Sequence, residues 1–294
     1  MSQSFARGAM LTRGSADVRA WVIGHPIGHS LSPVLHTAAY RALGLDHTFE
    51  RANVEAVNLP HWVEQIDRDT MLGLAVTMPH KRAIMGFLDV IDPLAQATMA
   101  VNTVVPAGRV LAGFNTDVHG IVEAVRETAG DRSLRRAVII GSGATACSAL
   151  AAVGTLHIRE ITIVARRFDG PYSIRRVETQ LGITAEFIPW RLADLVAQRM
   201  AEADLVISTV PAGVGDCWAN RVHFQPDATV LDVVYSPWPT ELAQQAQNDG
   251  ARVAPGTLML LHQAALQVSL MTGREAPVAL MREALTAAIE GRET

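Results

Sequence analysis

The chain is poor in cysteine and in lysine. Its 294 residues include only Cys147 and Cys217, too few for a disulfide framework, so we expect a reducing compartment, the cytoplasm. Of the 25 basic residues, Lys81 is the one lysine, and the others are arginine. An arginine keeps its proton near neutral pH, whereas a lysine amine can release it. The single lysine is therefore a candidate for proton transfer, unless composition bias left one lysine by chance.

The chain also lacks a large charge excess and a long apolar run. Its formal net charge of −4 argues against non-specific nucleic-acid binding and against a polybasic membrane patch. The longest segment without Asp, Glu, Lys or Arg, residues 137–158, contains three glycines, which favours a strand, turn and helix over a membrane span. Residues 1–17 have no apolar core of signal-peptide length and are expected to form a disordered leader.

Apolar residues make up 49% of the chain and charged residues 18%, enough for two packed domains at this length. In the first half the pattern predicts strands at 18–24, 47–52 and 72–77, helices at 32–43, 59–67 and 80–87, and a hairpin over 101–105 and 109–112. In the second half it predicts a helix at 117–128, strands at 137–140, 160–164, 185–188, 205–208 and 230–234 with helices between them, and two terminal helices at 258–272 and 277–289.

Such alternation indicates an α/β fold with two units in tandem, joined near residues 117–122, the second of them a parallel sheet with helices on both faces. The pattern does not show on which unit the terminal helices pack.

A glycine-rich turn follows the strand at 137–140. The segment Gly141-Ser142-Gly143-Ala144-Thr145-Ala146 fits the dinucleotide fingerprint G-x-G-x-x-A and precedes a helix. Gly141 permits the tight turn, Gly143 lets a pyrophosphate approach the backbone, and Ala146 lets helix and strand pack closely. The alternative is a turn with a structural role only.

The end of the next strand indicates which dinucleotide is bound. NAD-binding proteins tend to place an acid there, whereas this chain has Arg166 and Arg167, and its first acid comes later, at Asp169. Two guanidinium groups suit a 2′-phosphate, so we expect NADP. The alternative is a pair of solvated surface arginines.

Several loops of the first half carry polar side chains. Ser30 and Ser32 precede a helix and could hold a carboxylate, although from this pattern alone Ser32 reads as an N-cap with Pro33 at the first helical position. Lys81 follows a strand and a proline turn, and amide, hydroxyl and carboxylate groups follow at 101–103 and 113–117. Together these groups suit a polyhydroxylated ligand. No pair among the ten histidines has metal-ligand spacing, so we expect no metal.

The chain resembles the shikimate dehydrogenase family from about Trp21 to its end. The resemblance rests on VIGHPIGHSLSP, VTMPHK, AVNT, GFNTD, IIGSGATA, VARR, ISTVP, LDVVYSPWPT and PGTLMLLHQA, in that order. It implies a substrate-binding domain (18–118 with 257–294) that the C-terminal helices complete, and a Rossmann domain for NADP (119–256). The implied reaction is reversible reduction of 3-dehydroshikimate to shikimate.

The resemblance also implies roles for individual residues. Lys81 and Asp117 would be the catalytic pair. Substrate would be bound by Ser30 and Ser32 at its carboxylate and by Thr77, Asn102, Tyr235 and Gln263 at its hydroxyls or ring. The cofactor would be bound by Gly141, Ser142, Gly143, Ala144 and Thr145 at the pyrophosphate, by Ala165, Arg166 and Arg167 at the 2′-phosphate, and by Thr209, Val210, Val233 and Gly256 at the nicotinamide.

The chain departs from the family's common pattern at three places. Ala75 stands where Asn often precedes Val-Thr, Ala144 stands where the turn often has a further glycine, and Ala165 and Arg167 flank Arg166 where Asn and Thr are common. Two other functions remain open: an NAD-using quinate/shikimate dehydrogenase, and a non-catalytic nucleotide-binding regulator of the same fold. We expect a monomer or homodimer.

Overall fold

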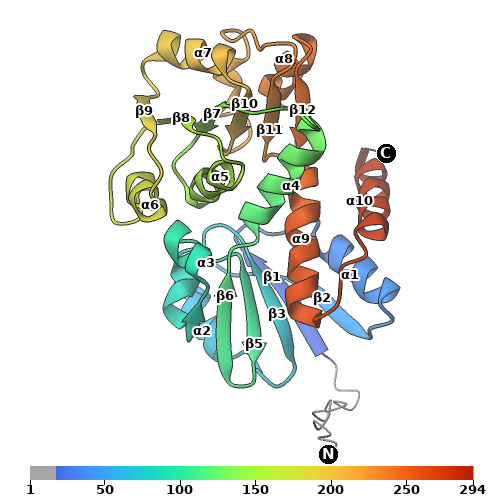
Figure 1. Ribbon diagram of the computed structural model, residues 1–294. Coiled ribbons are helices and arrows are strands. Elements are labelled where there is room, and N and C mark those ends of the chain that lie inside the picture. The colour runs from blue at the N-terminus through green and yellow to red at the C-terminus, as the bar shows by residue number, and fades with distance from the viewer. Residues whose placement is uncertain (1–17, 294) are drawn as a thin grey trace, which may run out of the picture.

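The computed structural model describes residues 18–293, which form two six-stranded sheets, one above the other in Figure 1. The leader expected at residues 1–17 lies outside the described residues. Within the described part of the chain, no helix is long and apolar enough to cross a membrane.

The first sheet is mixed and has the order β2-β1-β3-β5-β6-β4. Its strands are β1 (Val18–Gly24), β2 (His47–Asn53), β3 (Met71–Val76), β4 (Val90–Ile91), β5 (Thr103–Ala107) and β6 (Val110–Phe114). β1 pairs in parallel with β2 and β3, whereas β5 runs antiparallel to β3 and to β6, as the expected hairpin requires. The start of β5 and the end of β3 therefore lie at the same edge of the sheet. The connecting helices are α1 (Ser32–Ala42), η1 (Ala56–Asn58), α2 (Leu59–Glu64), η2 (Ala83–Phe87) and α3 (Pro93–Thr98).

The second sheet is parallel throughout and has the order β12-β11-β10-β7-β8-β9. Its strands are β7 (Arg136–Ile140), β8 (Glu160–Ala165), β9 (Glu186–Pro189), β10 (Leu205–Ser208), β11 (Thr229–Asp232) and β12 (Arg252–Pro255), and its helices are α5 (Ala144–Thr155), α6 (Ile174–Leu181), α7 (Ala193–Glu202), η3 (Asp216–Trp218) and α8 (Glu241–Asn248). This is the doubly wound order of a Rossmann sheet. The direction of winding reverses between β7 and β10, where such sheets bind their ligands.

Two helices connect the two sheets, α4 (Asp117–Ala129) and α9 (Gly256–Thr272), and α10 (Val278–Glu293) follows α9. α9 packs along α4, and α10 packs against α1 beside the first sheet (Figure 1). The close approach of α4 and α9 depends on Gly120, because a Cβ there would lie 2.7 Å from the carbonyl oxygen of Met259. The sequence pattern had left the place of the terminal helices open.

The apolar strands are buried because helices cover both faces of the second sheet. Residues 137–140 of β7 and 205–208 of β10 are each at most 2% exposed. Their continuous apolar runs, without the alternation of a half-exposed strand, are what a central parallel strand requires.

Three details of the secondary structure differ from the sequence prediction. The helix expected at 80–87 is a 3₁₀ turn over Ala83–Phe87 alone. The elements β4, α3, α8 and β12 were not predicted. Asp92 does more than end the preceding segment, because its carboxylate caps α3 by accepting from the amides of Leu94 and Ala95. Ser32 is not the N-cap of α1 but its first residue, and its side chain makes no cap hydrogen bond.

Candidate active site

A cleft of about 1150 Å³ lies between the two sheets and is lined by residues of both. Every residue that the sequence predicted for the site lines it. From the first sheet and the terminal helices these are Ser30, Ser32, Thr77, Lys81, Asn102, Asp117 and Gln263; from the second sheet they are Gly141, Ser142, Gly143, Ala144, Thr145, Ala165, Arg166, Arg167, Thr209, Val210, Val233, Tyr235 and Gly256. Segments up to 233 residues apart in the chain thus meet at one cleft.

Lys81 and Asp117 form an ion pair in the wall of the cleft, with 2.5 Å between Nζ and Oδ2. The Lys81 side chain is 13% exposed and that of Asp117 is 5% exposed. Lys81 lies in the turn after β3, where its carbonyl accepts from the amide of Val101, and Asp117 begins α4. The Lys81 amine is positioned by the Asp117 carboxylate and is open to the cleft, so it can give and take a proton.

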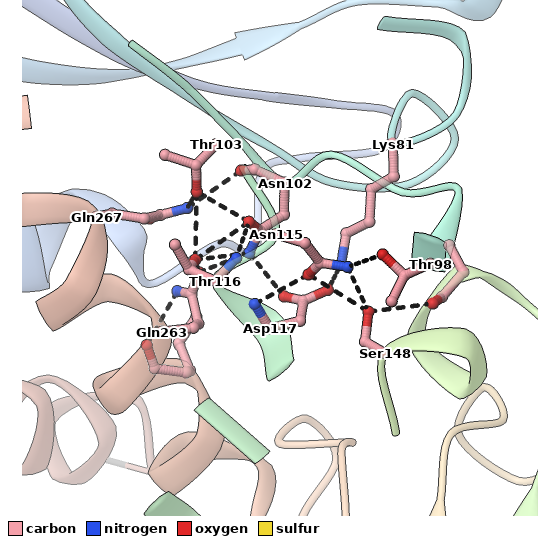
Figure 2. A network of polar contacts seen from close by, with 12 residues as sticks. Lys81, Thr98, Asn102, Thr103, Asn115, Thr116, Asp117, Ser148, Gln263 and Gln267 are labelled. Atoms are coloured by element: carbon pink, nitrogen blue, oxygen red, sulfur yellow. Dashed lines mark hydrogen bonds and ion pairs between the residues drawn. The ribbon is translucent and has the colours of Figure 1, made fainter. Parts of the chain in front are cut away.

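Asn102 orients the Asp117 carboxylate from the other side (Figure 2). Its Nδ2 donates to Oδ1 of Asp117 at 2.8 Å and to Oγ1 of Thr116 at 2.9 Å, and its Oδ1 accepts from the amide of Thr116 at 2.7 Å. Gln263 on α9 lies at the edge of this network, with its Oε1 3.3 Å from Nδ2 of Asn102. The two oxygens of Asp117 thus have different partners, the ammonium of Lys81 and the amide of Asn102.

Asn115 connects this network to the second sheet. Its Nδ2 donates to Oγ1 of Thr98 at 2.8 Å and to Oγ of Ser148 on α5 at 3.0 Å, while its Oδ1 accepts from the amide of Asp117 at 3.2 Å (Figure 2). All four residues are buried. The start of α4, which carries the carboxylate, is therefore hydrogen-bonded to the helix that follows the glycine turn.

Ser30 and Ser32 also line the cleft: Ser30 lies in the loop that leads into α1, and Ser32 is the first residue of that helix. The Ser30 hydroxyl accepts from the amide of Ser32 at 3.3 Å, and the Ser30 carbonyl accepts two bonds from the Arg51 guanidinium, at 2.9 and 2.6 Å. The Ser32 hydroxyl makes no hydrogen bond with another described residue and faces the cleft. Because Ser32 is not needed as a cap, its hydroxyl can bind a ligand.

The glycine turn fits a dinucleotide phosphate. Gly141 has φ +124°, and a Cβ there would lie 2.3 Å from Oγ1 of Thr209, so only glycine suits this position. A Cβ at Gly143 would meet nothing within 4 Å, which leaves open space beside the backbone at the start of α5. The turn lies at the switch point between β7 and β10, and the free amides of the α5 N-terminus favour an anion.

Arg166 and Arg167 follow β8, line the same cleft and are exposed. Neither forms an ion pair with another described residue. The first acid after the strand, Asp169, does not line the cleft; its carboxylate lies 3.6 Å from Nε of Arg175. Two free guanidinium groups with no nearby acid suit a phosphate on the adenosine ribose better than a bare ribose hydroxyl.

The remaining wall of the second sheet is apolar and tightly built. A Cβ at Gly256 would lie 2.3 Å from the carbonyl oxygen of Val233, so the start of α9 can approach the end of β11 only with glycine. Thr209 donates from Oγ1 to the carbonyl of Ile140 at 2.7 Å, which joins β10 to β7 below the glycine turn. With Val210, these residues line the cleft beside the glycine turn.

The polar residues of the cleft that sequence reasoning missed include Gln267 and Arg82. Gln267 Nε2 donates to the carbonyl of Asn102 at 3.1 Å, and its Oε1 lies 3.2 Å from Nε2 of His36. His36 and Gln267 are 231 residues apart, so no local pattern could have paired them. Among residues 18–293, no group of three or more His, Cys, Asp or Glu is placed to hold a metal ion.

A Rossmann sheet with a glycine turn at its switch point, facing a buried Lys-Asp pair across one cleft, defines a dinucleotide-dependent oxidoreductase with two α/β units. Known proteins identify the family. The sequence model of the family 'shikimate dehydrogenase substrate binding domain' matches residues 22–104. The sequence model of the family 'shikimate 5′-dehydrogenase C-terminal domain' matches residues 256–286. The shikimate dehydrogenase (NADP(+)) of Moorella thermoacetica is 35% identical over 92% of this chain and 94% of its own length. This chain therefore belongs to the shikimate dehydrogenase family.

Solved structures agree with this assignment. The crystal structure of Mycobacterium tuberculosis shikimate dehydrogenase superposes with a TM-score of 0.84 at 37% identity, covering 92% of this chain and 99% of that one. The quinate dehydrogenase of Corynebacterium glutamicum, in complex with NAD, superposes with a TM-score of 0.80 at 26% identity, covering 92% and 99%. The two-unit fold is thus shared by enzymes named for different substrates, and the residues of the cleft must distinguish them.

Proposed function

We propose that this protein catalyses the reversible, NADPH-dependent reduction of 3-dehydroshikimate to shikimate. One observation carries the proposal: the Lys81–Asp117 ion pair lines the same cleft as a set of hydroxyl and amide side chains and the glycine turn of the Rossmann sheet. A proton donor therefore shares one cleft with a site for a polyhydroxylated acid and a site for a dinucleotide.

Most of the substrate contacts come from the first unit, and Tyr235 adds one from the second. Ser30 and Ser32 bind the carboxylate, because their hydroxyls lie at the entry to α1, where backbone amides favour an anion. The ring and its hydroxyls are bound by side chains around the Lys-Asp pair: Thr77, Asn102, Tyr235 and Gln263. Asn102 has both its amide groups engaged by Thr116 and Asp117, so its position is fixed before substrate arrives.

Reduction requires a hydride at the carbonyl carbon and a proton at the oxygen. The bound dinucleotide supplies the hydride, or accepts it in the reverse direction. Lys81 gives a proton from its ammonium to the oxygen as negative charge develops there, and takes one from the shikimate hydroxyl in the oxidation. Asp117 holds the ammonium in place and keeps a negative charge beside it.

The second unit supplies the cofactor contacts. Residues 141–145 at the glycine turn bind the pyrophosphate, and Ala165, Arg166 and Arg167 hold the 2′-phosphate. Thr209, Val210, Val233 and Gly256 line the nicotinamide. The open space beside Gly143 and the unpaired arginines after β8 support NADP as the dinucleotide.

The domain limits and cellular setting belong to the same proposal. We assign 18–118 and 257–294 to the substrate-binding domain and 119–256 to the Rossmann domain, supported by the packing of α9 and α10 on α1 and of α9 on β3 and β5. Cys147 and Cys217 are both free thiols, which suits the cytoplasm. The enzyme is expected to act as a monomer or homodimer.

Steady-state oxidation of shikimate and of quinate, each with NADP and with NAD, tests the proposal. We expect shikimate with NADP to give the highest kcat/KM. A higher kcat/KM for quinate with NAD would contradict it and identify an enzyme that degrades quinate. Binding of NADPH without turnover of either acid would instead identify a nucleotide-binding regulator. Lys81→Ala, purified in the same way, shows whether the activity comes from this protein or from a contaminating host enzyme.

A further inference from the structure

Arg82 reaches from the first unit to the second. It follows Lys81 in the turn after β3, yet its Nη2 lies 3.8 Å from Sγ of Cys147 on α5, and its guanidinium carbon lies 5.5 Å from the centre of the Tyr172 ring, in the loop before α6. α5 and α6 lie on the side of the second unit that faces the first (Figure 1). Arg82 thus crosses the cleft at the end where the Rossmann sheet has its glycine turn.

The charge of Arg82 has no negative partner. Its Nε is buried without a hydrogen bond, and no carboxylate of residues 18–293 forms an ion pair with it. Its neighbour Cys147 does not supply the missing charge, because burial raises the pKa of that thiol despite the nearby guanidinium. A partly buried cation without a counter-ion is costly, so such groups usually meet an anion when the site is filled.

The surroundings of Arg82 indicate which anion. Cys147 lies in the first turn of α5, whose amides face the cleft after the glycine turn, and Tyr172 lies in the loop that also carries Arg166 and Arg167. All three arginines line the same cleft. We propose that Arg82 binds a phosphate of the dinucleotide from the substrate-binding side, as a cofactor ligand supplied by the first unit.

This inference rests on the proposed function, since it requires that the cleft binds NADPH. It adds a distinct claim: dinucleotide affinity depends on a residue outside the Rossmann unit. A guanidinium can hold two phosphate oxygens at once, whereas lysine offers only a point charge. Charge alone therefore accounts for part of the affinity, and the guanidinium geometry for the rest.

The test measures binding to the protein without substrate, so that catalysis is not the readout. Wild type, Arg82→Gln, Arg82→Lys and the control Arg126→Gln are titrated with NADPH, NADH and adenosine 2′,5′-bisphosphate. Arg126 suits as the control because it lies on α4, is exposed and is paired with Glu123 at 2.8 Å. We expect Arg82→Gln to weaken NADPH binding by about 10- to 100-fold, Arg82→Lys to restore part of it, and the control to match wild type.

The three ligands distinguish the phosphates. Equal losses for NADPH and NADH identify the pyrophosphate as the partner of Arg82, and a loss confined to NADPH and the bisphosphate identifies the 2′-phosphate. Wild-type affinity of Arg82→Gln for all three ligands would overturn the inference while leaving the proposed function intact. Failure of the wild type itself to bind NADPH would refute the proposed function.

Thermal unfolding of the protein without ligand separates binding from a structural role. Removing an unneutralised cation should leave the Tm unchanged or raise it. A lowered Tm, together with an equal loss of shikimate binding that Arg82→Lys does not repair, would mean that the variant displaces the adjoining Lys81. That result would overturn the assignment of Arg82 as a phosphate ligand.

Discussion

Lys81 and Asp117 are joined by an ion pair of 2.5 Å although 36 residues separate them in the chain. Antiparallel pairing of β5 with both β3 and β6 brings the two together, because it places the turn after β3 and the start of α4, which follows β6, at one edge of the sheet. Asn102, at the start of β5, binds the second carboxylate oxygen. The Asp117 carboxylate stabilises the ammonium of Lys81 with one oxygen, and its other oxygen accepts from Asn102. Of the two members of the ion pair, Lys81 is therefore the one that remains available to a ligand.

Replacing Lys81 should abolish most of the turnover and spare most of the binding. We expect Lys81→Ala to lower kcat by about 10²–10⁴, the usual contribution of a positioned proton donor. Shikimate binding should suffer less, because Ser30, Ser32 and Gln263 remain. Lys81→Arg keeps the charge but cannot release a proton near neutral pH, and should recover little activity. Steady-state kinetics of both variants check this, and near-complete rescue by arginine would show that charge alone suffices.

Chemical labelling gives an independent check, since an amine-selective reagent can modify only Lys81 and the N-terminal amine. Activity should fall in proportion to the fraction of Lys81 that is modified, and bound shikimate should slow the modification of Lys81. Full activity with Lys81 quantitatively blocked would refute its role.

The two serines should separate binding from stability. Ser30→Ala and Ser32→Ala should both raise the KM for shikimate. Only Ser30→Ala should also reduce stability, by roughly 0.5–1.5 kcal/mol, because its hydroxyl accepts the Ser32 amide while that of Ser32 caps nothing. Urea unfolding and kinetics measure the two effects. Thr37→Ala, at an exposed position of α1, is the matched control. An unchanged KM in both serine variants would leave these residues with structural roles only.

Much of the fold was predictable because its signals are local. The glycine turn, the strand before it and the helix after it lie within 20 residues, and their spacing alone predicts a dinucleotide site. The strands that were missed are short: β4 has 2 residues and β12 has 4. Such strands exist because neighbouring strands pair with them, which no local pattern reveals.

In the site, too, residues with a local sequence signal were predicted and residues whose role depends on distant contacts were not. Lys81 stood out by residue type and position, and Asp117 through the family resemblance. Gln267 did not stand out, since its role depends on contacts with His36 and Asn102 far away in the chain. Arg82 does not stand out among 24 arginines, because only the packing of the two units shows that it lacks a negative partner within residues 18–293. For Ser32, the local pattern was misleading: a serine before proline resembles a cap, yet the helix begins one residue earlier.

Arg166 should determine the choice of dinucleotide. Arg166→Ala removes a charge-assisted phosphate contact worth about 1.5–3 kcal/mol, so NADPH binding should weaken by about 10- to 150-fold and NADH binding should change little. Titration with each dinucleotide gives the comparison. Arg159→Ala is the matched control, because Arg159 is exposed just before β8 whereas Arg166 follows the same strand at its other end. Equal weakening of both dinucleotides would show that Arg166 does not contact the 2′-phosphate.

His36 should make the protein less stable in mild acid. It is fully buried, stacked on Phe49 at 3.9 Å and bonded to Tyr40 and Gln267, and burial lowers its pKa from 6.5 to about 3. Burial also raises the pKa of Tyr40, which therefore stays neutral and cannot offset a charge on the ring.

The direction of the effect follows from which state takes up the proton. Below pH 6.5 His36 is protonated in the unfolded chain but not in the folded protein. The free energy of unfolding therefore decreases as the pH is lowered from 6.5 to about 3. At pH 5 this single group accounts for roughly 2 kcal/mol of lost stability relative to pH 8. His36→Gln, which cannot titrate, should lose about that much less between these pH values in urea unfolding. Titration of the carboxylates changes the stability of wild type and of His36→Gln alike. If the free energy of unfolding of the two proteins had the same pH dependence, His36 would have to be protonated in the folded protein as well.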